Sequence, residues 1–147
     1  MDREGLLGRE DEAWAAFSKA FTDVPEDRRD VEGVVPGWSV KDLVWHCGYW
    51  ADYVGDVLER MSAGQPEPPD QDWDALNRMV ADDGKSKSWD EVVVAAELGR
   101  DRARKALIAI PEVTDAAASE FTYETFDHYD EHTAEIVSFA AGGLGSN

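Results

Sequence analysis

Apolar residues at helical spacing are the feature of this sequence that most restricts its fold. In four segments such residues recur three, four or seven positions apart, and no segment shows the alternating pattern of a half-buried strand. The segments cover about residues 3–24, 39–64 and 88–110, and a fourth begins between residues 124 and 127. Because an amphipathic helix must bury its apolar face against another element, this pattern predicts an all-α protein, specifically a four-helix bundle.

Two of these helices have recognisable start signals. Ser39 and Ser88 are suitable N-cap residues, because a serine hydroxyl can accept a hydrogen bond from a free backbone N–H of the first turn. Asp42 and Glu91 occupy the third helical position after each serine, where an acidic side chain can complete a reciprocal cap. We therefore expect helices to begin directly after both serines.

The connection between the second and third helices is unusually long. Residues 65–88 are rich in Pro, Asp and Lys, which is typical of a loop. Trp73, Leu76 and Val80 nevertheless have helical spacing and predict a short helix lying over the bundle. We expect a single domain over residues 1–143, followed by a flexible tail over residues 144–147.

Composition restricts the partners and the compartment. The chain of 147 residues has a formal net charge of −18, so nucleic-acid phosphates and anionic lipid headgroups should repel it. No apolar run approaches the length of a membrane span, and the first residues do not have the pattern of a signal peptide. The single cysteine, Cys47, excludes an internal disulfide and suits a reducing compartment. These features predict a cytoplasmic protein with neither a nucleic-acid nor a membrane partner.

The three histidines are the strongest candidates for a functional site. His128 and His132 are four residues apart on the last predicted helix, so their side chains lie on one face, one turn from each other. His46 lies in the apolar stripe of the second helix and should point into the bundle. Three neutral imidazoles could bind one divalent metal ion, for which zinc is favoured and nickel or iron are alternatives.

Simpler interpretations of the same residues stay open. A histidine on an apolar stripe is often a hydrogen-bonded core residue, and a pair of histidines four apart occurs by chance on many surface helices. Cys47 is adjacent to His46, but neighbouring helical residues diverge by about 100°, so the imidazole is badly placed to activate the thiol. Asp42, Asp127 and Glu135 are the carboxylates nearest to the histidines in the sequence, and any of them could support an imidazole from outside a metal site.

Two segments resemble the DinB-like superfamily. The sequence GWSVKDLVWHCGYW, residues 37–50, is similar to the opening of the second helix in that group, and TFDHYDEHTAEI, residues 125–136, is similar to its closing helix. The group includes the N-terminal domain of mycothiol-dependent maleylpyruvate isomerase and the ClbS/DfsB-type bundle proteins. The resemblance implies a DinB-like four-helix bundle with a metal ion held by His46, His128 and His132.

Three functions remain after this resemblance. The first is a metal-dependent S-transferase that uses a low-molecular-weight thiol such as mycothiol or bacillithiol, or a related detoxification enzyme. The second is a hydrolase that confers self-resistance to a reactive metabolite, and the third is a non-catalytic module that binds a small molecule. In each case Trp50, Trp73 and Asn77, near the long connection, are candidates to line the pocket. Both a homodimer and a monomer are compatible with the sequence.

Overall fold

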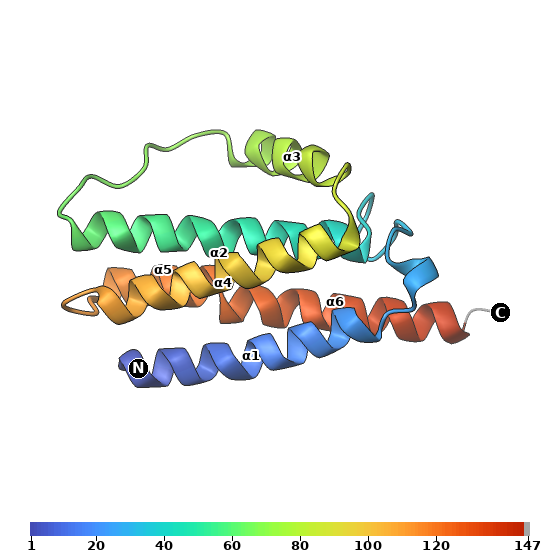
Figure 1. The fold of residues 1–147 in the computed structure, drawn as a ribbon, viewed down its shortest axis with the longest axis horizontal. Coiled ribbons are helices and arrows are strands. Elements are labelled where there is room, and N and C mark those ends of the chain that lie inside the picture. The colour runs from blue at the N-terminus through green and yellow to red at the C-terminus, as the bar shows by residue number, and fades with distance from the viewer. Residues whose placement is uncertain (146–147) are drawn as a thin grey trace.

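The fold is an all-α bundle whose axis follows the long helices. A computed structural model describes the backbone of residues 1–145 and the side chains of residues 1–142. In chain order the elements are α1 (Arg3–Asp23), the 3₁₀ turn η1 (Glu26–Arg28), α2 (Val40–Ser62), α3 (Trp73–Gly84), α4 (Trp89–Ala109), α5 (Asp115–Glu124) and α6 (Phe126–Gly145). Figure 1 shows α1, α2 and α4 running side by side, while α5 and α6 follow one another along the fourth position of the bundle. The predicted four-helix architecture is confirmed.

The bundle is held together by two main helix pairs, α2 with α4 and α1 with α6. Their facing sides form one apolar core, in which the largest fully buried aromatic side chains are Phe17, Phe121 and Tyr129. Within residues 1–145 the structure contains no strand, only an isolated bridge between Val35 and Trp38. The helices among the described residues are too polar or too short to cross a membrane.

Both helix start signals are confirmed as full capping boxes. The Ser39 hydroxyl accepts a hydrogen bond from the backbone N–H of Asp42, whose carboxylate accepts one from the backbone N–H of Ser39. The same reciprocal pair joins Ser88 and Glu91 at the start of α4. Each pair satisfies two backbone donors that the first helical turn leaves without a partner, and so defines where the helix begins.

The long connection contains the expected short helix. α3 begins at Trp73 and continues to Gly84, so Asp82 and Asp83 belong to a helix and not to a loop. α3 lies over α2, as Figure 1 shows at the top of the view. Two hydrogen bonds attach it, from the Trp45 indole to the Val80 carbonyl at 2.9 Å and from the Trp50 indole to the Asn77 side chain at 3.0 Å.

The C-terminal third differs from the sequence prediction. A separate helix, α5, precedes α6, and the backbone breaks between them at Thr125, whose φ and ψ are −113° and −94°. Thr114 caps α5. Only three of the ten residues of this helix are buried, and its apolar pattern in the sequence is correspondingly weak. Val137, one of the apolar residues of the last helix, is 56% exposed. The predicted flexible tail, residues 144–147, falls partly on the last turn of α6 and partly outside the described residues, so it stays a prediction.

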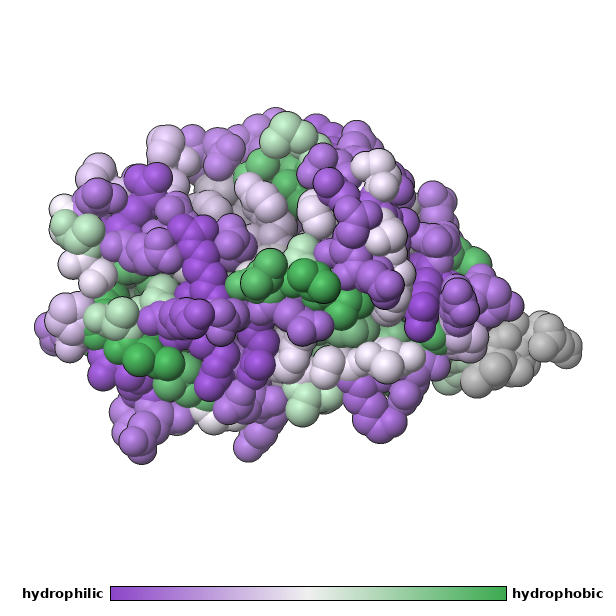
Figure 2. Space-filling model, in the orientation of Figure 1, coloured by the Kyte–Doolittle hydropathy of each residue, from purple (hydrophilic) through white to green (hydrophobic). Residues whose placement is uncertain are grey.

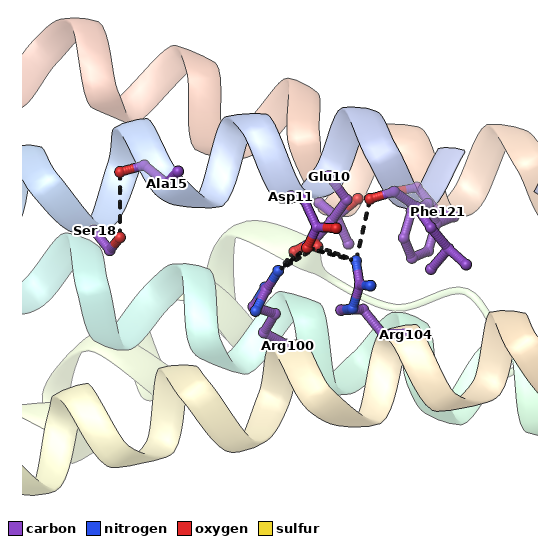
Figure 3. Close-up of polar contacts among 9 residues, drawn as sticks. Glu10, Asp11, Ala15, Ser18, Arg100, Arg104 and Phe121 are labelled. Carbon is purple, nitrogen blue, oxygen red and sulfur yellow. Dashed lines mark hydrogen bonds and ion pairs between the residues drawn. The ribbon is translucent and has the colours of Figure 1, made fainter. Parts of the chain in front are cut away.

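A buried ionic cluster joins α1 to α4. The Glu10 carboxylate is fully buried and accepts two hydrogen bonds from Arg100, at 2.8 and 3.0 Å, and one from Arg104 at 2.8 Å. Figure 3 shows both guanidinium groups of α4 pointing at Glu10 and its neighbour Asp11 on α1.

The outer surface, by contrast, is strongly polar, and Figure 2 shows apolar residues only in small separate patches on the visible face.

Candidate metal centre

The three histidines converge between α2 and α6. The Nε2 atoms of His46 and His128 are 3.0 Å apart, and one ring nitrogen from each of the three side chains lies within 4.8 Å of the others. The ring centroids are 4.7 to 5.5 Å apart. His46 reaches this point because it lies in the buried stripe of α2, and the other two because they are one turn apart on α6. The structure therefore brings together all three histidines that the sequence analysis singles out.

The outward-facing nitrogen of one imidazole has a carboxylate partner. Nδ1 of His132 is in close contact with Oε1 of Glu135, one helical turn along α6. A hydrogen bond donated by Nδ1–H leaves the lone pair of the other ring nitrogen, Nε2, free for a metal ion, and carboxylate–histidine pairs of this kind are common around metal sites. Of the three carboxylates considered from the sequence, only Glu135 is hydrogen-bonded to a histidine among the described residues. Asp42 instead completes a helix cap and pairs with Lys85.

Burial keeps two of these imidazoles in the neutral form that binds metal. Burial, together with His132, lowers the pKa of His46 from 6.5 to about 4. Burial, then His132 and His46, lowers the pKa of His128 to about 2. Nδ1 of both rings is buried and has no hydrogen-bond partner among the described residues. At neutral pH both rings therefore present unprotonated nitrogen, which a metal ion requires of histidine.

The donor set fits a single divalent ion. Zinc–nitrogen bonds of about 2.1 Å place ligand nitrogens roughly 3 to 4 Å apart, close to the separations found here. Three imidazoles without a bound thiolate form a donor set used by zinc and by nickel or iron, and they leave a coordination position open. Cys47 does not join them: its thiol is fully buried in the core, and burial raises its pKa well above the ordinary value. It therefore behaves as a small apolar side chain.

The histidines lie against an open pocket of about 610 Å³. Trp50, Trp73 and Asn77 all line it, together with Tyr53 and Tyr123. The Trp50 indole, hydrogen-bonded to Asn77, connects the wall formed by α2 to that formed by α3. A small molecule entering this pocket would meet both aromatic rings and the three imidazoles.

Four carboxylates complete the pocket, and sequence analysis does not identify this group. They are Glu120, Glu124, Asp127 and Glu131, from α5 and α6. A signal was present, because residues 120, 124, 128 and 132 are four apart and all acidic or histidine. α5, however, is not predicted from the sequence, so nothing there places its two acids beside the histidines.

Glu124 is the most perturbed of these acids. Its side chain is 7% exposed, and burial, followed by the negative charge of Glu120, raises its pKa from 4.5 to about 8. Between pH 4.5 and 8 the folded state thus holds a proton that the unfolded chain has released, so stability declines as pH rises over this range and levels off above about 8. Between pH 7 and 9 we expect metal-free protein to lose about 1 kcal/mol of unfolding free energy through this group.

The substitution Glu124→Gln should remove that loss, because the amide does not ionise. Urea unfolding at pH 7 and 9, with a chelator present, measures it in wild type, Glu124→Gln and the exposed control Glu12→Gln. The control should lose as much stability as wild type. An equal loss in all three proteins would show that Glu124 does not hold this proton.

Comparisons with known proteins agree with this architecture. The sequence profile of the DinB superfamily matches residues 10–141. A crystal structure of an uncharacterised protein from Escherichia coli UTI89 superposes with a TM-score of 0.79, covering 97% of this chain and 94% of that chain at 15% identity. At this identity the structural likeness shows the fold alone. No curated protein matches the sequence.

Proposed function

The chain belongs to the DinB superfamily, and from that premise we propose that it binds one divalent metal ion, preferably zinc, and acts as a metal-dependent thiol S-transferase or related detoxification enzyme. The single observation that carries the proposal is the convergence of His46, His128 and His132 at an open pocket. A purely structural histidine cluster would have no need of a cavity of about 610 Å³ beside it.

The residues around the triad have distinct roles in this proposal. Glu135 holds the His132 ring in one orientation and fixes its tautomer. A bound ion would lower the pKa of a thiol or water that joins it, which supplies a nucleophile at neutral pH. The aromatic wall that includes Trp50 and Trp73 excludes water from one side of the substrate and orients its apolar part. Mycothiol or bacillithiol is the expected thiol.

Glu124 lies in the same pocket and can bind or release a proton there. It is buried, and at neutral pH it carries the proton that its raised pKa retains. A carboxyl group with a pKa near the working pH can both donate and accept a proton during a reaction. We therefore assign Glu124 the role of acid or base beside the reacting groups.

Metal binding is tested first by one substitution. In His128→Ala we expect zinc affinity to fall at least about 100-fold, because removal of a ligand costs more than the 10- to 100-fold typical of its outer partners. Affinity is measured on untagged protein by competition with a chromogenic chelator. Asp130→Asn, on the same helix but paired with Arg9 on the side facing α1, is the matched control and should bind zinc as wild type does. Equal affinity in wild type and His128→Ala would overturn the site.

The type of reaction is tested with the zinc-loaded protein. Conjugation of mycothiol or bacillithiol to an electrophile such as monochlorobimane, followed by fluorescence, should increase in proportion to bound zinc. Glu124→Gln should lower the rate and flatten its dependence on pH while zinc binding is retained. Substrate breakdown that needs no thiol would instead assign the site to a hydrolase, and tight ligand binding without turnover would assign it to a binding module.

A further inference from the structure

Carboxyl groups without ion-pair partners line the pocket beside the histidines. Glu120, Glu124, Asp127 and Glu131 all face the cavity, and no lysine or arginine lines it. Among the described residues, none of these four side chains forms an ion pair or a side-chain hydrogen bond. The other two buried acids among the described residues do have partners: Glu10 binds two arginines and Asp42 a lysine. The pocket is therefore a place where the chain leaves carboxylates without a counter-charge.

Of these four acids, Glu124 is the one whose burial is most unfavourable for the stability of the fold. Its side chain is more than nine-tenths buried and lines the cavity without a polar partner among the described residues. A carboxylate this buried loses much of its hydration, so its charge is unfavourable for folding unless a partner offsets it. A positively charged ligand in the cavity would supply the missing partner.

The aromatic side chains that line the same cavity also suit this ligand. Trp50, Tyr53 and Trp73 form a cluster with ring centroids 5.0 to 6.1 Å apart, and all three line the cavity. Aromatic faces attract cations through the negative potential above the ring, most strongly for tryptophan. Aromatic rings together with carboxylates in one cavity are the combination that recognises an organic cation.

We propose that the ligand of this pocket is an organic cation with an apolar body, such as a quaternary or protonated amine. A divalent ion at the histidines does not reverse this selectivity, because three carboxylates without Glu124, or four with it, carry more negative charge than the ion neutralises. This inference about the ligand rests on the proposed function only where it makes the cation the substrate of the enzyme. Binding of the cation itself needs no metal.

The test uses two probes that differ in charge alone. Para-hydroxymethyl-phenyltrimethylammonium and para-tert-butylbenzyl alcohol have the same shape, with N⁺ or carbon at the quaternary centre, and the cationic group cannot ligate a metal through nitrogen. Para-tert-butylbenzoate is the anionic member of the series. Binding is followed by tryptophan fluorescence at pH 8 and physiological salt. We expect the cation to bind about ten-fold or more tightly than the alcohol. In metal-free protein, where the carboxylate has no zinc to bind, the benzoate should bind more weakly than both.

Variants separate the pocket from the overall charge of the protein. Glu124→Gln and Glu120→Gln should each reduce the preference for the cation several-fold, while Glu12→Gln, an exposed acid on α1, changes the net charge equally and should leave it intact. Equal binding of cation and alcohol, or equal loss in all three variants, would overturn the proposal. Each titration is made on metal-free and zinc-loaded protein. Cation selectivity without any zinc uptake would contradict the proposed function alone, and zinc uptake without selectivity would contradict this inference alone.

Discussion

Replacing Glu10 with alanine is expected to lower the free energy of unfolding by about 3 to 5 kcal/mol. The carboxylate is fully buried and accepts hydrogen bonds from both Arg100 and Arg104, as Figure 3 shows. Without it, the two guanidinium groups of α4 would lie beside each other in a partly buried interface with only Asp11 to offset their charge. Because the cluster joins α1 to α4, its loss should weaken the whole bundle. Urea unfolding followed by circular dichroism measures the effect.

Asp11→Ala is the matched control for this prediction. Asp11 contacts the same two arginines but is 56% exposed, and exposed ion pairs contribute at most about 1 kcal/mol. We therefore expect the control to stay within about 1 kcal/mol of wild type. If Glu10→Ala were equally mild, the buried cluster would contribute specificity of packing and not stability.

The second large effect is expected at the contact between α2 and α4. A Cβ atom added at Gly99 would lie 2.3 Å from the carbonyl oxygen of Gly48, and one added at Gly48 would lie 2.8 Å from Cα of Ala96. These neighbours are backbone atoms, so a side chain can be accommodated only if the two helices separate. For Gly99→Val we expect a loss of about 3 kcal/mol, at the upper end of the usual cost of overpacking.

Gly8→Val provides the comparison within the same kind of element. Gly8 lies in α1, and an added Cβ there meets nothing within 4 Å. Valine has a slightly better helix propensity than glycine, so this variant should be within about 0.5 kcal/mol of wild type. Thermal unfolding of both variants distinguishes a packing cost from a propensity cost, and a similar stability for the two would show that the helices are not held at this distance.

The long helices could be predicted from sequence because local patterns determine them. The stripe of α2 and the serine caps of α2 and α4 are short-range features, and each has one structural solution. His46, His128 and His132 could be placed on inward faces for the same reason. They meet at one point because the faces of α2 and α6 on which they lie both point into the bundle.

The acidic wall of the pocket could not be predicted in this way. Its position depends on α5, whose weak apolar pattern and break at Thr125 hide that Glu120 and Glu124 continue the face of the two α6 histidines. The choice of Glu135 over Asp42 and Asp127 as the histidine partner depends likewise on tertiary geometry. Asp42 was available by sequence, but the cap of α2 and Lys85 occupy it. Whether a carboxylate caps a helix or pairs with a histidine depends on tertiary contacts that the sequence pattern does not contain.

The most direct test of the central claim is the metal content of the untagged protein, purified without a metal-affinity column. Inductively coupled plasma mass spectrometry after incubation with zinc and removal of excess should find close to one ion per chain in wild type. His128→Ala, with its helical circular dichroism unchanged, should contain almost none. Wild type without metal after this treatment, or the variant with as much metal as wild type, would contradict the assignment of His46, His128 and His132 as a metal site.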